Sequence, residues 1–310
     1  PSKTNTHRIS LQLKELARLR ALLTGNDVLR QEGLAQAVRF AASYRMRRSK
    51  AERKEALALL EEIIELGGPE TAQIAILRDI ILAEGELGEI RRDSSWNAAA
   101  LLIQHVDSES PHQALAQTTL ARTLTQLALH FPNDLEEHEI SIESALEQAF
   151  YLAEAASLSE SQPADSHAAL GQLVLIHGSD EAYEDAEILF RVALDQDPDL
   201  EPAQLGLALC LSLQNRADEA LVEIESLLKK GGRFPGLWAL RAKLKADAGD
   251  YQSALRDIKR AINLAPEAGL YFLDAARIAE LAGQSQQAES YRDKGNELLG
   301  KFGPLAENHL

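Results

Sequence analysis

Residues 236–266 read GLWALRAKLKADAGDYQSALRDIKRAINLAP, and features of this stretch return at 34-residue intervals on both sides of it. The interval is clearest for alanine, which occurs at Ala186, Ala220, Ala254 and Ala288. Other residues that keep the step are Trp238 and Phe272, Gly249 and Gly283, and Ala193, Leu227, Ala261 and Gly295. A constant period of this length predicts a solenoid of stacked helix–turn–helix units.

One period contains two helical segments and a break. Gly249 is placed to end the first helix, and Pro266 follows the second. The stretch resembles a tetratricopeptide repeat, a family in which small residues such as Ala242 and Ala254 lie where the two helices of a unit cross closely. The resemblance covers residues 167–300 as four units, and the degraded last unit is typical of a cap. The predicted helix pairs are 168–177 with 182–196, 202–213 with 217–229, 236–248 with 251–263, and 269–282 with 285–299.

The 34-residue register fails upstream of residue 167. We therefore expect divergent helical hairpins over residues 1–166, four repeat units over 167–300 and a tail over 301–310. Helical spacing predicts segments that include 51–66, 71–83 and 139–158. Ser94 or Ser95 is expected to cap one further helix, and Pro111 to open another that ends at residues 131–134. The predicted fold is all-α, a right-handed α-α superhelix of about fifteen helices.

Charge is distributed unevenly along this acidic chain. The net charge is −16, but residues 1–54 carry +9, residues 55–166 carry −17 and residues 167–310 carry −8. The basic residues gather in a cluster formed by Arg45, Arg47, Arg48, Lys50, Arg53 and Lys54. Three interpretations stay open for this cluster: a solvated helix corner, docking onto an acidic protein surface of this chain or of a second copy, and binding of nucleic acid or an anionic surface. The acidity of the remaining chain disfavours nucleic acid.

No residue pattern indicates catalysis or a cofactor. Cys210, the single cysteine, lies in an apolar run and is expected in the core. The eight histidines lack metal-binding spacing and are interpreted as surface or capping residues. Acidic residues fall on helix exteriors and in first turns, where the helix dipole favours them. We therefore expect no enzymatic activity, no cofactor and no metal site.

The compartment is weakly constrained by the sequence. No apolar run is long enough for a membrane-spanning helix, and no basic-then-apolar leader opens the chain. Cytoplasm is the default expectation. Because the first residue is Pro1, a leader removed upstream would instead allow a periplasmic or secreted location.

The family resemblance implies that the first helix of each unit lines a concave groove that contacts ligands. The Lys, Asn and Arg clamp that some members use for C-terminal carboxylates is not found at the matching positions. The predicted lining is mostly apolar with a polar edge and consists of Leu175, Leu205, Leu209, Leu213, Leu240, Lys243, Leu270, Leu273, Asp274 and Arg277. Either these leucines are covered by an apolar helix or segment of a partner, of a second copy or of the chain's own N-terminal helices, or they are buried between stacked units.

These features favour a non-enzymatic interaction scaffold or adaptor that binds an apolar helix or peptide in its groove. The alternative is a regulatory protein that binds nucleic acid or an anionic surface through residues 45–54. The opposite charges of the segments also predict self-association.

Overall fold

A computed structural model describes residues 50–66, 71–87, 90–107, 110, 112–159, 164–177, 180–229 and 234–300. These residues form fourteen α-helices and no strand, which confirms the all-α helical repeat architecture. The chain divides into two compact units, residues 1–85 and 86–310. This division concerns compactness, so the repeat-based division at residue 166 stays a prediction. No helix in the described ranges is both long and apolar enough to cross a membrane.

The first unit contains α3 (Lys50–Leu66) and most of α4 (Thr71–Leu87). The predicted helical segment 51–66 is confirmed, and Ala56, Leu60 and Ile63 are buried on α3. The predicted α4 was too short, because this helix continues through Gly85 to Leu87.

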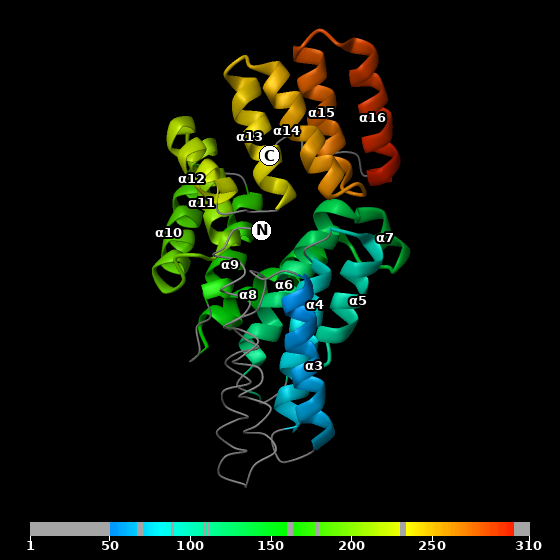
Figure 1. The fold of residues 1–310 in the computed structure, drawn as a ribbon, viewed down its shortest axis with the longest axis vertical. Coiled ribbons are helices and arrows are strands. Elements are labelled where there is room, and N and C mark those ends of the chain that lie inside the picture. The colour runs from blue at the N-terminus through cyan, green and yellow to red at the C-terminus, as the bar shows by residue number, and fades with distance from the viewer. Residues whose placement is uncertain are drawn as a thin grey trace. The chain divides into compact units, whose positions relative to one another are not determined.

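The second unit consists of successive helices that are shown in Figure 1. Their bounds are α5 Arg92–Leu102, α6 Gln113–His130, α7 Pro132–Glu137, α8 Ile142–Ser157, α9 Ala164–His177, α10 Asp180–Gln196, α11 Glu201–Leu213, α12 Ala217–Lys229, α13 Pro235–Asp247, α14 Tyr251–Leu264, α15 Gly269–Leu281 and α16 Ser285–Leu299. The four predicted pairs correspond to α9/α10, α11/α12, α13/α14 and α15/α16, with most ends within two residues. The first helices of successive pairs pack against one another, so we call α9, α11, α13 and α15 the inner helices and α8, α10, α12, α14 and α16 the outer helices.

The 34-residue alanines mark the close contacts of the repeat. Ala186, Ala220 and Ala254 are fully buried, and Ala288 is 1% exposed. A larger side chain at these positions would separate the two helices of a pair, because protein interiors are close-packed.

The turns between paired helices repeat with the same geometry. Asn215, Gly249 and Gly283, each 34 residues apart, have φ of +61°, +82° and +73°. At Gly249 the amide donates to the carbonyl of Ala246, and the next amide, of Asp250, donates to Lys245 O at 2.8 Å. This is a Schellman motif, which requires a left-handed residue after the helix. The motif therefore extends to Asn215, where asparagine stands in for glycine.

Two glycines make room for one buried ring between repeats. Phe190 on α10 is 1% exposed and lies against Gly171 on α9 and Gly206 on α11. A Cβ at residue 206 would lie 2.2 Å from Cε1 and Cζ of the ring. The absence of these side chains lets three helices from two units meet around one aromatic residue.

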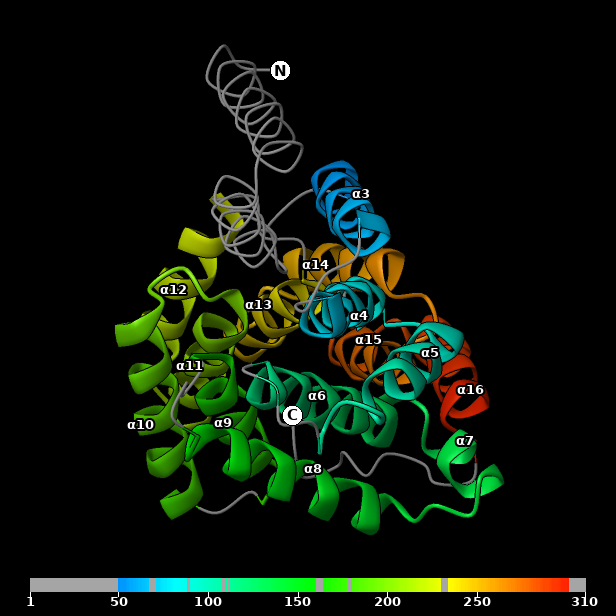
Figure 2. The same ribbon diagram turned by 90° about the horizontal axis from the view of Figure 1, so that it is seen from below.

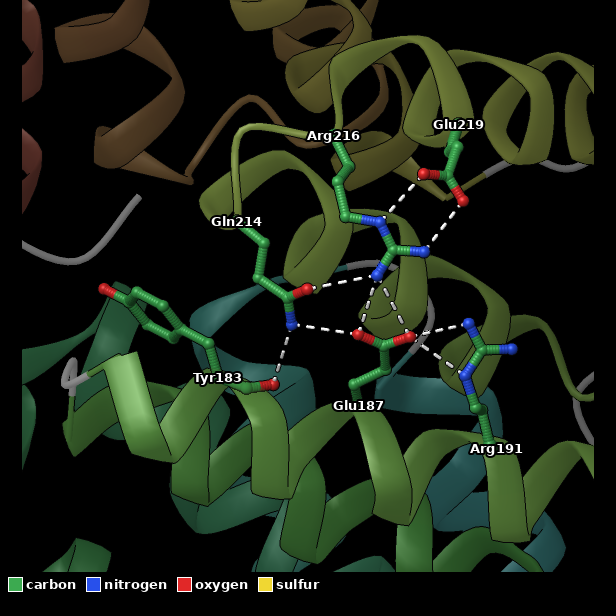
Figure 3. A network of polar contacts seen from close by, with 6 residues as sticks. All are labelled: Tyr183, Glu187, Arg191, Gln214, Arg216 and Glu219. Atoms are coloured by element: carbon green, nitrogen blue, oxygen red, sulfur yellow. Dashed lines mark hydrogen bonds and ion pairs between the residues drawn. The ribbon is translucent and has the colours of Figure 1, made fainter.

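A polar network also joins these two units (Figure 3). Glu187 on α10 accepts hydrogen bonds from Arg191 Nη2 at 2.6 Å and from Gln214 Nε2 at 2.9 Å. The oxygen that accepts from Gln214, Oε2, also lies 3.1 Å from Nη1 of Arg216, and Arg216 makes a two-pronged contact with Glu219 at 2.7 and 2.8 Å. Burial by itself would raise the pKa of Glu187. The hydrogen bonds from Arg191 and Gln214 and the positive charges of Arg191 and Arg216 outweigh burial, so the pKa of Glu187 lies below its usual value.

Helix α6 differs from the repeat helices because most of its circumference is buried. It packs against α5, α8 and α9, and seen from below it lies within the arc of the inner helices (Figure 2). Its four buried threonines each donate a hydroxyl hydrogen bond to the carbonyl four residues earlier, at 2.7 or 2.8 Å: Thr118, Thr119, Thr123 and Thr125. Since each hydroxyl is satisfied within the helix, α6 can be surrounded by apolar neighbours.

The predicted starts of two helices before the repeats were wrong, whereas α6 ends at His130, as predicted. The residue before α5 is Arg91, whereas Ser94 and Ser95 are buried within its first turn. Helix α6 begins at Gln113, two residues after Pro111. Pro132 both follows the end of α6 and opens the short helix α7, because proline is well suited to a first helical position.

Candidate functional site

The predicted groove residues lie on the inner helices, but they differ in exposure. Leu175, Leu240 and Leu270 are buried, with 5–6% of each exposed. Leu175 and Leu240 belong to one hydrophobic cluster with core residues of α10 and α12. For these three residues, burial between stacked units accounts for the apolar side chains without any partner.

The half-buried leucines on α11 form the accessible part of the predicted lining. Leu205, Leu209 and Leu213 pack against the same cluster but retain solvent contact. Leu205 extends toward α13, where its Cδ2 would lie 3.1 Å from a Cβ at Gly236. Leu273 instead points to its own outer helix, since its Cδ2 would lie 2.7 Å from a Cβ at Gly295. Leu273 therefore packs within the last pair.

The predicted polar edge is brought together on α13 and α15. Lys243 and Arg277 occupy equivalent positions 34 residues apart, and Asp274 lies one turn before Arg277. Lys243 and Asp274 are half-buried, whereas Arg277 is exposed. Within the described part of the chain, no hydrogen bond or ion pair holds any of the three. We call these residues the inner polar cluster.

The charges of the inner polar cluster influence one another at longer range. Burial raises the pKa of Asp274 to about 6, although the positive charges of Arg277 and Lys243 oppose the rise. Burial, and then the charge of Arg277, lowers the pKa of Lys243. An incomplete set of polar partners in a half-buried position is suited to completion by a ligand.

Two residues beside this cluster escaped the sequence analysis. The ring of His130, at the end of α6, lies 6.0 Å from that of Tyr271 on α15. The prediction of a surface or capping histidine was wrong for His130, because its Nδ1 is buried and has no hydrogen-bond partner among the residues that the structure describes. Burial lowers its pKa to about 4, so the ring is neutral at pH 7. Burial also raises the pKa of Tyr271, whose hydroxyl would lie 3.8 Å from a Cβ at Gly236.

The beginning of the second unit contacts the loop between α14 and α15. The backbone amide of Arg92 donates to Oε2 of Glu267 at 3.1 Å, and Ile90 packs against the cores of both regions. The unit's own helices thus occupy one end of the inner face.

The basic cluster is only partly within the described residues. Arg45, Arg47 and Arg48 lie outside them, and Lys50 begins α3. Lys54 is exposed, whereas Arg53 is half-buried with its guanidinium beside Gly85 of α4. Of these six residues, the structure therefore shows only Lys54 as a fully accessible charge.

Two further ionisable side chains, Cys210 and Asp257, take part in the packing of the repeats. Cys210 is fully buried, as predicted, and burial raises the pKa of its thiol to about 12, which removes its nucleophilic form at pH 7. Asp257 accepts from Arg241 at 2.8 Å and from Lys245 at 2.7 Å, which ties α13 to α14. The described residues include no group of three or more His, Cys, Asp or Glu side chains that could hold a metal ion.

Comparison with known proteins agrees with this architecture. Residues 179–244 match the Tetratricopeptide repeat family profile, which covers α10 to α13 closely. No curated protein sequence matches the chain.

Solved structures show similarity of fold at low sequence identity. The chain resembles one in the crystal structure of the APC/C hetero-tetramer Cut9–Hcn1, with 14% identity and a TM-score of 0.54 over 92% of this chain and 53% of that one. A tetratricopeptide repeat protein from Parabacteroides merdae is 16% identical, with a TM-score of 0.47 over 88% and 94%. YrrB, described as a TPR protein with an unusual peptide-binding site, is 17% identical, with a TM-score of 0.36 over 69% and 100%. The TM-score of 0.54 for the Cut9–Hcn1 chain, at 14% identity, indicates a shared fold alone.

Proposed function

We propose that this chain, a tetratricopeptide repeat protein, is a non-enzymatic interaction scaffold that binds an apolar helix or extended peptide on its inner face. The observation that supports this most directly is the juxtaposition of half-buried leucines on α11 with the inner polar cluster on α13 and α15. Apolar residues give a helix-in-groove contact most of its affinity, and a few polar groups fix its register.

The leucines on α11 provide the apolar part of the surface. Leu205, Leu209 and Leu213 are already anchored against the repeat core, so a ligand would cover them without reorganising the scaffold. Leu240 has a different role, because it is 6% exposed and holds repeats together.

Lys243, Asp274 and Arg277 provide the polar part. Two cations around one carboxylate leave both donors and an acceptor available, and none is tied to a neighbour within the described residues. A partner segment with one polar or charged side chain among apolar ones would satisfy these groups on binding.

The test uses affinity capture from the native source, followed by mass spectrometry. Leu209→Glu and Lys243→Ala are each expected to remove or strongly deplete the proteins that wild type captures, because they change accessible positions on the proposed surface. Leu281→Glu is the matched control, since Leu281 is 50% exposed at the end of α15 and lies outside this surface. Circular dichroism checks folding of each variant.

Capture of the same proteins by all folded variants would contradict the proposal. Leu240→Glu is unsuitable for this test, because a charge at this buried position would destabilise the repeat stack.

A further inference from the structure

Large hydrophobic side chains are exposed on a second surface, formed by the outer helices α8, α10 and α12. Seven large hydrophobic residues are exposed among the described residues. Five of them belong to these three helices or, for Leu158, to the residue that ends α8: Tyr151, Leu158, Ile188, Val192 and Val222. Single exposed apolar residues are normal, but a group of them on the outer helices of successive hairpins is a candidate contact surface.

These residues are aligned by the repeat. Ile188 and Val222 are 34 residues apart and are 59% and 68% exposed. Tyr151 and Val192 are 41 apart, which is also the separation of Ala145 and Ala186, the buried alanines of α8 and α10. Because equivalent positions of stacked hairpins face the same way, Tyr151, Ile188, Val192 and Val222 form one line across three helices, which we call the outer stripe.

The outer stripe is bordered by negative charge. Ten acidic residues of α8, α10 and α12 are exposed, such as Glu147 and Glu184, against two basic ones, Arg191 and Lys229. Arg191 is already paired with Glu187 at 2.6 Å (Figure 3). The surface therefore combines an apolar centre with acidic margins.

The next outer helix has the opposite character. The position on α14 equivalent to Ile188 and Val222 is occupied by Arg256, and Lys259 and Arg260 are exposed on the same helix. A positively charged ligand would be attracted to the acidic outer helices α8, α10 and α12 and repelled by the basic α14. It is therefore expected to lie on the first three and to stop before α14.

We propose that the outer stripe binds a basic amphipathic helix of a partner protein. The apolar face of that helix would cover the stripe, and its Lys and Arg side chains would reach the acidic margins. Helices α8, α10 and α12 are connected through α9 and α11, which pack between them, so their spacing exceeds the ~10 Å of directly packed helices. A partner helix of about 18 residues, roughly 27 Å long, would give the necessary reach. This surface is separate from the inner face, so the scaffold could hold two partners at once.

The probe is a fluorescein-labelled synthetic helix of about 18 residues, with leucine on one face and lysine on the other. Fluorescence anisotropy with the full chain is measured at roughly 50 mM salt, where surface electrostatics are weakly screened. A cationic peptide is attracted to any chain of net charge −16, so the decisive comparison is between protein variants. Ile188→Ser combined with Val222→Ser is expected to weaken binding at least about tenfold, because it removes apolar contact without changing charge.

Leu281→Ser serves as the control, since it removes an exposed apolar side chain outside the stripe and should leave the affinity unchanged. A peptide of the same composition in scrambled order should bind wild type and the double variant equally weakly. Equal binding of the amphipathic peptide by wild type and the double variant overturns the proposal, as does absence of binding to wild type. Dimerisation of wild type that the double variant loses, measured by sedimentation, would also overturn it, because a second copy would then be the occupant.

Discussion

Replacing Gly206 with alanine tests whether the repeat is held together by a notch for Phe190. In an isolated helix the substitution is stabilising by about 1 kcal/mol, because alanine is the better helix former. The structure predicts the opposite sign. A Cβ at residue 206 would lie 2.2 Å from two carbons of the Phe190 ring, and the ring would have to move by about 1.5 Å to restore normal carbon contact.

The surroundings prevent this movement. The ring is 1% exposed, and the same ring atoms also lie 3.0 Å from where a Cβ of Gly171 on α9 would be. Overpacking of a close-packed core costs typically 1–3 kcal/mol, and an approach of 2.2 Å places this substitution in the upper half of that range. After subtraction of the gain of about 1 kcal/mol in helix propensity, we expect a net loss of about 1–2 kcal/mol in the free energy of unfolding.

Urea denaturation followed by circular dichroism measures this loss. Phe190→Leu alone should also destabilise, since it removes buried apolar atoms. In the double variant the shorter side chain makes room for the alanine, so the combined loss should be smaller than the sum of the two. A stabilised or unchanged Gly206→Ala variant would refute the reasoning, and so would strictly additive losses.

Other predictions concern the turns, the ionisable groups and association. Gly249→Ala should cost about 1 kcal/mol in urea denaturation although nothing lies within 4 Å of the new Cβ, because φ is +82°; an unchanged midpoint would contradict this. Glu187→Ala should cost about 1–2 kcal/mol, because it leaves the donors of Arg191 and Gln214 unpaired, and should do so less at high salt; a salt-independent loss would argue against an ionic role. The pKa of Asp274 is raised to about 6, so the folded state favours the protonated form and stability falls as pH rises from about 4 through 6. The free energy of unfolding of Asp274→Asn should therefore match that of wild type below pH 4 and exceed it by about 1–3 kcal/mol above pH 7. Thermal melts in which variant and wild type are equally stable above pH 7 would exclude this. Light scattering should show larger particles at low than at high salt if the oppositely charged segments associate, and a salt-independent mass would count against self-association.

The repeat region was predictable because every level of the sequence agreed there. Periodic alanines, turn glycines and apolar spacing all favoured the same helix pairs, and the bounds of α11 to α16 follow them closely. Asn215 was missed because asparagine replaces the glycine that marks the other two turns, although it adopts the same left-handed conformation. Helix α6 lacks a clear polar face because it is surrounded by other helices, so its interior position could not be deduced from periodicity.

The candidate site was less predictable, because it depends on contacts between distant segments. Leu209 and Leu240 are similar in sequence context, yet one retains solvent contact and the other is enclosed. The ring of His130 lies against that of Tyr271, 141 residues later, and no local pattern encodes that contact.

The position of α6 limits how the inner face can act. His130 at its end lies against Tyr271, and the amide of Arg92 is bound to Glu267, so this end of the inner face is already occupied by the unit itself. A partner there would have to displace contacts that bury a neutral histidine, and such displacement subtracts from its binding energy. The leucines of α11 carry no such cost, because they are anchored and still partly exposed. An inner ligand is therefore expected to bind from α11 toward the inner polar cluster and to stop before α6. The side chains of the outer stripe are exposed, including Tyr151 on α8, the helix against which α6 packs, so the stripe is expected to stay accessible whether or not the inner face is filled.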